Sequence, residues 1–276
     1  MIAVCITTYN HRAYIAQAIE SALAQQCDEP IRMYIGDDAS TDGTSDICEQ
    51  YARSDNRIVY IRNRENIGLV ANTLNLYRRI VADRCEYIAM LDGDDYWIEA
   101  DKLQLQIDFL RTHREYGFVH TAAYDDVDGA LVDVDNADKP TGDISRQYDF
   151  HGALHTNCTV VFRTSLLQNV DFSELQEQHF HVLDYPLYGI FSQSTQFGFI
   201  YRYTSAWRNH KSVSHPGSIM AFLRYQFRYL RAWRWLDKRY HGHFHFSWCK
   251  AVLWYTTQII YSVIHYCKPQ ICKKMQ

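Results

Sequence analysis

Residues 86–97 read Glu-Tyr-Ile-Ala-Met-Leu-Asp-Gly-Asp-Asp-Tyr-Trp. The apolar run over 87–91 predicts a buried strand, and three carboxylates, Asp92, Asp94 and Asp95, follow it directly. Open α/β sheets bind their ligands at the carboxyl ends of the strands. Carboxylates crowded at such an edge repel one another, and a hard cation such as Mg²⁺ or Mn²⁺, usually shared with substrate phosphates, relieves that repulsion. The stretch therefore predicts a metal site that takes a diphosphate ligand.

A second interpretation of the acidic cluster is helix capping. A helix is expected to begin near Asp101, and Asp94 or Asp95 could satisfy its first backbone amides. From these residues alone the metal site and the cap are equally well supported.

The first 112 residues alternate between β-branched runs and helical patterns. Strands are predicted at Ile2–Thr7, Ile31–Gly36, Ile58–Ile61 and Tyr87–Leu91, and helices at Tyr14–Gln25, Ser45–Ala52, Val70–Val81 and Lys102–Thr112. Such a series predicts a parallel sheet covered on both faces, with its ligand crevice at the strand carboxyl ends. No G-x-G-x-x-G follows the first strand and no G-x-x-x-x-G-K-[ST] occurs, which excludes the usual dinucleotide and P-loop sites.

Composition places the chain among globular proteins. It has 276 residues, of which 47% are hydrophobic and 22% charged, enough for a sizeable core. The eight cysteines contain no C-x-x-C pair, so neither a zinc site nor a disulfide framework is favoured. Met1 leads straight into a predicted strand without the features of a signal peptide. We expect a cytoplasmic protein.

Five segments in the first 115 residues occur together in a familiar order. They are Val4-Cys-Ile-Thr-Thr-Tyr-Asn10, Ser21-Ala-Leu-Ala-Gln-Gln26, Ile35-Gly-Asp-Asp-Ala-Ser-Thr-Asp-Gly-Thr44, Asn66-Ile-Gly68 and Asp92-Gly-Asp-Asp95. This set resembles the family 2 glycosyltransferases, a large inverting group with the GT-A fold. The segments Leu183-Asp-Tyr185 and Trp207-Arg-Asn-His210 resemble the acceptor half of the same family.

The resemblance implies a fold and a domain plan. The fold is α/β of the GT-A, Rossmann-like type: a mixed, mostly parallel sheet flanked by helices. The GT-A domain would span 1–218, with a nucleotide-sugar donor half at 1–115 and an acceptor half at 116–218. Residues 219–276 would form a helical C-terminal extension rich in basic and aromatic residues.

The resemblance also implies how the donor is held. Thr7, Thr8 and Tyr9 would pack around the base and ribose, Asp38 or Asp37 would contact the base, and Asn66 and Gly68 would lie over the nucleotide. Asp92 or Asp94 would contact the ribose, and Asp94 or Asp95 would ligate Mn²⁺ or Mg²⁺. Arg208 would contact the diphosphate and His210 would complete the metal shell. From the residues alone, a capping and turn role is favoured over a base contact for Asp37–Asp38, and a turn glycine is an adequate explanation for Gly68.

An inverting transfer needs a general base at the acceptor hydroxyl. Asp171, Glu174, Glu177 and Asp184 lie in the right part of the chain, and Asp184 is preferred because it precedes an apolar helix start, as in the family's acid-before-helix motif. The family usually has Glu-Asp or Gly-Asp there, whereas this chain has Leu183-Asp184. The alternative role is a helix cap with Pro186 in the first turn. His155, Thr156 and Asn157 are expected to line the acceptor pocket.

The predicted function is transfer of a sugar from a nucleotide-diphosphate sugar, expected to be UDP-linked, to a glycan or lipid-linked acceptor in cell-surface polysaccharide or O-antigen-type synthesis. The alternative is a non-catalytic protein that binds nucleotide sugars or acts as a scaffold.

The C-terminal part of the chain differs in charge from the rest. Residues 219–276 hold ten Lys or Arg and one acid, a net charge of +9, so the remainder carries −13. This predicts peripheral contact with the inner face of an anionic membrane; the alternative is a pair of helices packed on the core with a solvated basic face. The apolar stretch 251–267 is at the short limit for a helix that spans a membrane, so a spanning helix is not expected. No nucleic-acid-binding motif occurs, so a nucleic-acid partner is not expected.

Overall fold

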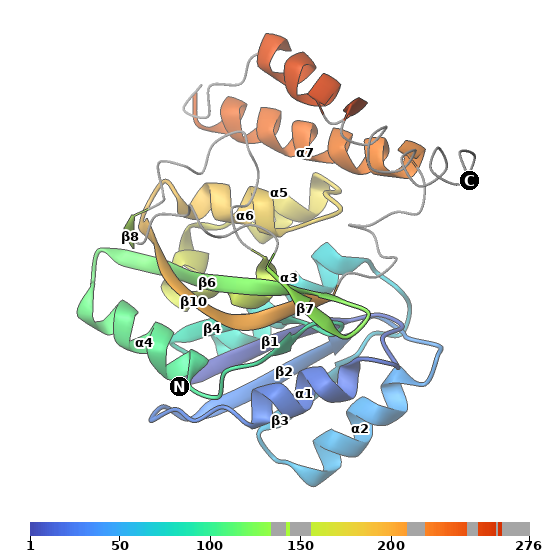
Figure 1. Cartoon of the computed structure of the whole chain (residues 1–276), viewed down its shortest axis with the longest axis vertical. Helices are drawn as coiled ribbons and strands as arrows, with labels where there is room; N and C mark the ends of the chain where they lie inside the picture. The colour runs from blue at the N-terminus through green and yellow to red at the C-terminus, as the bar shows by residue number, and fades with distance from the viewer. Residues whose placement is uncertain (134–141, 144–155, 209–218, 242–247, 258, 261–276) are drawn as a thin grey trace, which may run out of the picture. The chain divides into compact units, whose positions relative to one another are not determined.

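The computed structural model describes residues 1–133, 142–143, 156–208, 219–241, 248–257 and 259–260 (Figure 1). By its internal contacts the chain forms two compact units, one made of residues 1–148 and 153–208 and one made of 149–152 and 209–276. The predicted domain boundary at residue 218 falls on a residue outside those described, as do His155 and His210. The division at 218 therefore stays a prediction.

The first unit is built on a mixed sheet in the strand order β3-β2-β1-β4-β9-β6-β10-β5 (Figure 1). The amino-terminal strands β1, β2, β3 and β4 pair in parallel, as predicted, and span Ile2–Thr8, Ile31–Asp37, Ile58–Arg62 and Tyr87–Asp92. Each predicted strand is present within about one residue of its predicted ends. Local β-branched patterning was enough to find them because these strands are buried and short.

The carboxyl-terminal strands extend the same sheet. They are β9 (Val161–Arg163), β6 (Tyr116–Val127), β10 (Gln196–Arg208) and β5 (Tyr96–Trp97), with β7 (Ala130–Val132) beside β6 and β8 (Gly142–Asp143) beside β10. β9 is antiparallel to both β4 and β6, and β10 is parallel to β6, so β6 and β10 run in the same direction as β1–β4. The predicted mixed, mostly parallel sheet is confirmed.

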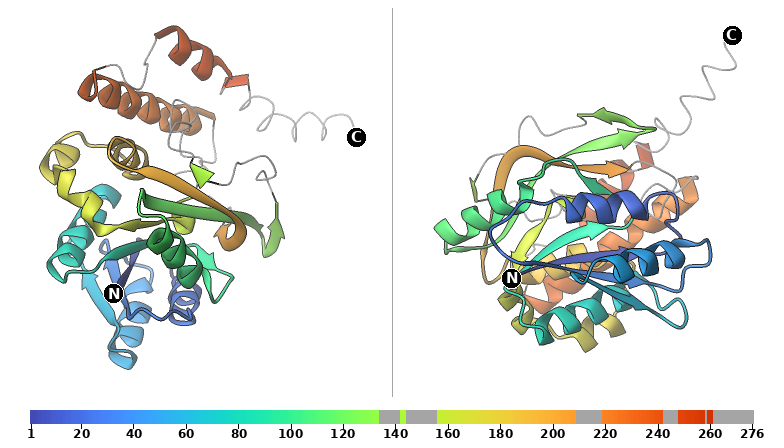
Figure 2. Two further views of the ribbon diagram at one scale, coloured as in Figure 1. Left: turned by 90° about the vertical axis from the view of Figure 1, so that its left-hand side faces the viewer. Right: turned by 90° about the horizontal axis from the view of Figure 1, so that it is seen from below.

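Helices cover both faces of the sheet (Figure 2). On one face α1 (Ile15–Leu23), α2 (Thr44–Ser54) and α4 (Lys102–Thr112) pack through a shared apolar core. On the other face α3 (Leu69–Ala82), α5 (Phe172–Glu177) and α6 (Asp184–Phe191) pack through an aromatic cluster that includes Tyr77, Phe162, Phe172 and Phe191. Short 3₁₀ helices, η2 (Asn157–Thr159) and η3 (Thr164–Asn169), flank β9. The second unit contains α7 (Ile219–Arg239).

Side-chain alternation decides which residues of β1 and β4 reach the second face. Ile2, Val4 and Ile6 belong to the core beneath α1, so Thr7 points to the opposite face, because successive strand residues alternate. Thr7 lies in register with Asp92 at the end of β4, and Ala89 and Leu91 belong to the same core as Ile6. Asp92 therefore leaves the sheet on the side of α3 and α6.

Lys102 is a buried cation at the start of α4. Its side chain is 0% exposed and its ammonium lies 4.7 Å from the centre of the Trp97 ring. The ammonium donates to the Gln106 side chain, and Gln106 in turn donates to the carbonyl of Thr159, 2.9 Å away. Burial lowers the pKa of Lys102 to about 7. The amine thus helps to fix η2, whose first residue, Asn157, contacts Asp92 at the end of β4.

The stability of the fold should depend on pH through Lys102. Because its pKa is about 7 in the folded chain and 10.5 in the reference state, the unfolded chain binds an extra proton between these values. The resulting penalty is complete below pH 7 and disappears above about pH 10.5. Replacing Lys102 by Met should remove this dependence. The difference in free energy of unfolding between Lys102→Met and wild type should fall by ~1.4 kcal/mol per pH unit from about pH 7.5 to 9.5.

Urea unfolding of both proteins at three pH values in that range would measure this difference. Groups that both proteins share cancel in the comparison. A difference that stays constant across the range would mean that Lys102 is charged in the folded protein.

Candidate active site

The carboxyl ends of the parallel strands meet at one edge of the sheet. In the pairing register Thr7 lies opposite Asp92 and Thr8 lies opposite Asp37. The loops that follow β1, β2 and β4 therefore start side by side. The predicted donor residues of these three loops are brought to a single edge.

Asp92 accepts hydrogen bonds from two neighbouring elements. The Thr7 hydroxyl donates to its Oδ1 at 3.1 Å, and the Asn157 amide nitrogen lies 3.2 Å from its Oδ2. The Tyr188 hydroxyl of α6 donates to the Asn157 Oδ1 at 2.8 Å. A chain of hydrogen bonds thus connects α6, through η2, to the acidic end of β4.

The Asp92 carboxyl is electrostatically strained. Burial, and then the neighbouring Asp94 charge, raise its pKa to about 7, while the bonds from Asn157 and Thr7 act in the opposite direction. The charge of Asp184 also contributes to the increase, which brings the predicted base into the same electrostatic environment. Asp92 thus titrates near neutral pH.

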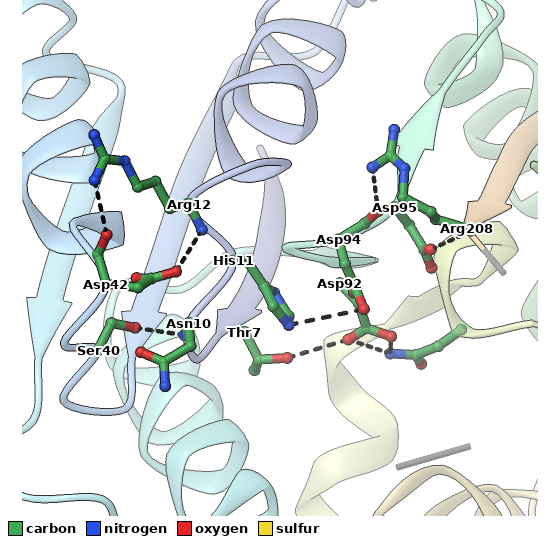
Figure 3. Close-up of polar contacts among 11 residues, drawn as sticks. Thr7, Asn10, His11, Arg12, Ser40, Asp42, Asp92, Asp94, Asp95 and Arg208 are labelled. Carbon is green, nitrogen blue, oxygen red and sulfur yellow. Dashed lines mark hydrogen bonds and ion pairs between the residues drawn. The ribbon is translucent and has the colours of Figure 1, made fainter. Parts of the chain in front are cut away.

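Asp94 is partly exposed, unlike its neighbour Asp95. Its side chain is 18% exposed, and its Oδ2 lies 3.7 Å from His11 Nε2, in the loop after β1 (Figure 3).

Asp95 is buried, at 2% exposure, and its Oδ1 accepts the backbone N–H of Arg208 at 2.9 Å. Burial and the Asp94 and Asp92 charges raise its pKa. The helix after the cluster is not capped by these aspartates: α4 begins at Lys102, and the Gln25 side chain accepts the Leu103 amide at 3.0 Å. The capping interpretation of the cluster is therefore wrong.

Arg208, at the end of β10, holds the acidic loop from the other side. Its guanidinium lies between the rings of Tyr14 and Tyr96, 4.6 and 4.9 Å from their centres. It donates to the Asp94 carbonyl oxygen and lies 3.6 Å from the Asp126 carboxylate. The predicted nucleotide contact is thus placed at the cluster, where its contacts fix the main chain of residues 94–95.

Two further loops are tied together by Asp38. Its Oδ1 accepts the Ile67 amide at 2.9 Å and its Oδ2 accepts the Gly68 amide at 2.8 Å. The structure therefore joins Asp38 to the Asn66–Gly68 loop, and the nucleotide contact of these residues stays a prediction. Asp37 is fully buried and accepts from the Ser40 amide and the Tyr60 hydroxyl, so its carboxylate faces the interior.

The loop after β1 is fixed to the loop after β2 (Figure 3). Asn10 has a positive φ of 56°, its amide donates to the Ser40 hydroxyl, and its side chain accepts the Thr41 amide, both at 2.9 Å. Tyr9 remains 44% exposed at this edge, whereas Thr8 is buried against Gly93. Tyr9 is thus accessible to a ligand, and Thr8 supports the acidic loop from below.

Asp184 is the first residue of α6. Its Oδ1 accepts the amide of Tyr185 at 2.7 Å, and burial raises its pKa. The Asp184 Oδ1 therefore accepts one backbone amide of the first turn, as a helix cap would. The Oδ2 atom is left for other contacts. Through Tyr188 and Asn157 the same helix is connected to Asp92.

The residues present fit a divalent cation that is completed by its substrate. Within the part of the chain that the structure describes, no three His, Cys, Asp or Glu side chains converge as a complete metal shell. Mg²⁺ and Mn²⁺ commonly use only one or two carboxylates and take their other ligands from phosphates and water. Asp94, with the crowded charge of Asp92 and Asp95 behind it, supplies such a set, and the predicted ligand His210 lies outside the described residues.

Sequence reasoning missed two parts of this site. His11 beside Asp94 follows the recognised Thr-Thr-Tyr-Asn segment and could have been found by extending it. Asn157 was expected to line the acceptor pocket, and its bond to Asp92, 65 residues away in the chain, carried no local signal.

Comparison with known proteins gives one matching family model, described as Glycosyl transferase family 2, over residues 3–171. The glucosyltransferase WfaP of Escherichia coli, named as a UDP-Glc:alpha-D-GlcNAc-diphosphoundecaprenol beta-1,3-glucosyltransferase, is 29% identical over 188 residues, 68% of each chain. Matches to mycobacterial relatives of unassigned function reach 38% identity but span only 31% of the length of those proteins and 39% of this chain.

Two solved structures share the fold. S. aureus TarS 1-349 in complex with UDP-GlcNAc superimposes with a TM-score of 0.61 at 16% identity, over 97% of this chain and 80% of the other. The mannosyltransferase PcManGT of Pyrobaculum calidifontis, in complex with GDP-Man and Mn²⁺, has a TM-score of 0.59 at 14% identity, over 86% of this chain and 64% of the other. At these identities the likeness establishes the fold.

The crowding at Asp92 should cost stability at neutral pH. Its pKa is about 7 in the folded chain against a reference of 3.8, so the folded state favours the protonated form. The associated stability is present below about pH 4 and is lost as the pH rises through 7. With EDTA present, the free energy of unfolding of Asp92→Asn minus that of wild type should rise with pH. The expected slope is ~1.4 kcal/mol per pH unit between about pH 4.5 and 6.5.

Urea titrations at matched pH values test this. Asp108→Asn, on the exposed face of α4, is the matched control because its carboxylate is already in water. If Asp92→Asn and wild type differ by the same amount at every pH, the carboxylates are not in electrostatic conflict.

Proposed function

Since the chain belongs to glycosyl transferase family 2, we propose that it transfers a sugar, with inversion, from a UDP-sugar to a hydroxyl of a glycan or lipid-linked acceptor. The observation that carries the proposal is the joining of Asp92 to α6 through Asn157 and Tyr188. One polar chain thus connects the donor side of the crevice to the helix that begins with Asp184.

On the donor side each accessible group has a role. Tyr9 and the Asp38-bound loop at Asn66–Gly68 enclose the base and ribose. Asp92, fixed in orientation by Thr7 and Asn157, accepts from a sugar or ribose hydroxyl. Asp94 is the principal metal ligand, with Asp95 behind it. A divalent cation bound there would act as a Lewis acid that neutralises charge on the departing diphosphate.

Arg208 contributes indirectly in this arrangement. Its guanidinium is engaged by Tyr14, Tyr96 and the Asp94 carbonyl, so it sets the position of the acidic loop. Contact with the diphosphate, as the resemblance implies, would use the same edge of the guanidinium and would need this arrangement to shift.

On the acceptor side we assign the general base to Asp184. A base must reach the acceptor hydroxyl and have a pKa closer to the working pH than that of an ordinary carboxylate. Burial raises the pKa of Asp184, which moves it in the required direction. The acceptor proton would pass to the second carboxylate oxygen as the acceptor oxygen attacks the anomeric carbon.

Two similar proteins support the substrate classes. WfaP is named as an enzyme that uses UDP-Glc and a diphosphoundecaprenol-linked acceptor, and TarS was solved with UDP-GlcNAc. PcManGT, in contrast, was solved with GDP-Man, so the nucleotide must be tested directly. None of the described helices is both long and apolar enough to cross a membrane. We place the enzyme in cell-surface polysaccharide synthesis, in the cytoplasm or at the inner membrane face.

Donor binding should require Asp94 and a divalent cation. Calorimetric titration with UDP, GDP, dTDP and CDP, each with and without Mn²⁺, should give Mn²⁺-dependent binding of UDP. The Asp94→Ala and Asp95→Ala variants should weaken it at least ~10-fold, the size of effect expected for loss of a metal ligand or its support. Asp108→Ala is the control for loss of a surface carboxylate. A folded protein that binds none of the four nucleotides would overturn the donor site.

Catalysis should require the Asp184 carboxylate while binding does not. Asp184→Asn keeps the shape and loses the base, so kcat should fall by roughly 10²–10⁴ with the Kd for UDP essentially unchanged. Asp171→Asn is the matched control, because Asp171 is a true N-cap that accepts the Ser173 and Glu174 amides. Full activity in Asp184→Asn would assign the base elsewhere. Loss of activity in both variants would point to helix capping.

A further inference from the structure

The exposed side chains of α7 that the structure describes form a stripe of mixed character. They follow a spacing of four and three: Met220, Arg224, Phe227, Arg231, Arg234 and Lys238. At ~100° per residue these six positions fall within a sector of about 80°. Trp233 and Leu236, on the opposite side of the helix, are buried. The stripe is therefore a defined surface, which we call the α7 stripe.

The segment after α7 adds an apolar surface. Residues 248–257 are helical, and Trp248, Val252 and Leu253 are 61, 62 and 67% exposed. The Arg234 guanidinium lies 4.8 Å from the centre of the Trp248 ring, so this segment is joined to the α7 stripe. Together they place four cations next to several large apolar side chains.

A basic face that is merely solvated does not account for this combination. Long cationic side chains on a water-facing helix need no exposed Phe, Trp, Val or Leu among them, yet Phe227 is 60% exposed within the stripe. Helices that lie in a membrane interface have this composition: basic residues for anionic headgroups and aromatic and aliphatic residues for the acyl boundary. The net charge of +9 on 219–276 complements an anionic bilayer.

We infer that the α7 stripe and residues 248–257 dock the protein on an anionic lipid bilayer. Arg224, Arg231, Arg234 and Lys238 bind the headgroups. Phe227, Trp248, Val252 and Leu253 enter the boundary between headgroups and acyl chains. This assignment does not depend on the donor or base assignments, because it concerns other residues and another ligand.

Cosedimentation with vesicles tests the cationic part. The full chain is mixed with vesicles of phosphatidylcholine alone or with 30% phosphatidylglycerol (about a third anionic lipid, so that the surface potential is strong). Wild type should bind only the anionic vesicles, and 0.5 M NaCl (a Debye length of roughly 4 Å) should release much of it. The triple variant Arg224→Gln, Arg234→Gln, Lys238→Gln should bind at least ~10-fold more weakly.

A matched control removes three exposed arginines from the first unit: Arg53→Gln, Arg78→Gln, Arg114→Gln. It has the same change in net charge and should bind like wild type. An equal loss in both triple variants would reduce the effect to net charge and overturn the docking surface. Tighter binding of wild type to a DNA duplex than to anionic vesicles would also overturn it.

The apolar part has its own readout. The double variant Phe227→Ser, Leu253→Ser keeps every charge and removes two exposed apolar side chains. Its binding to vesicles should be weaker, and the part that remains should be the electrostatic, salt-sensitive attraction to the anionic surface. Tryptophan fluorescence should shift to the blue on vesicle binding in wild type and less in this variant. UDP titration of each variant by calorimetry should be unchanged, which separates failure of docking from failure of the donor site. No blue shift in wild type would exclude insertion.

Discussion

The crowding of three carboxylates at the end of β4 is the constraint on which the site depends. Asp92, Asp94 and Asp95 occupy three of four consecutive positions at a partly buried sheet edge, and burial with mutual repulsion raises the pKa of Asp92 and Asp95. The chain offsets this from three directions. Thr7 and Asn157 donate to Asp92, and the Arg208 backbone donates to Asp95. These donors come from β1, η2 and β10, so three elements far apart in the chain must meet at the acidic loop.

The same compensation couples the two halves of the domain. Asn157 donates to Asp92 and accepts from Tyr188, which belongs to the helix that begins with Asp184. The side chain that orients Asp92 is therefore itself held by α6. Buried polar chains of this kind are strong when every member is satisfied and costly when one is missing. One network links Asp92 to α6, which is a physical reason for α6 to pack against the end of β4.

The sequence predicted what local patterning can encode. The strands and helices from Ile2 to Thr112 were found because apolar periodicity and turn residues specify them, and the resemblance placed Asp38, Asn66 and Gly68 together. Local sequence patterns could not predict the strand order β9-β6-β10-β5, because those pairings join residues far apart in the chain. The contacts of Asn157 with Asp92 and of Arg208 with Tyr14 and Tyr96 are long-range for the same reason. The aspartates alone also fitted a helix cap, and only the position of Gln25 at the start of α4 decides that question.

The acidic loop after β4 affects how a diphosphate could bind beside it, because both carry negative charge. Two phosphates brought beside Asp92 and Asp94 add repulsion to a site that already resists ionisation, and Arg208, the guanidinium nearest the loop, is held by two aromatic rings and a carbonyl. Under the proposed function a divalent cation held by Asp94 would turn this repulsion into attraction, and cation and diphosphate would each raise the affinity of the other by the same factor. Occupancy of the proposed donor site would then depend on both ligands. The repulsion among the carboxylates at the end of β4 would be the physical origin of this mutual effect. If the carboxylates did not repel one another in the empty site, binding a cation and a diphosphate would relieve less repulsion.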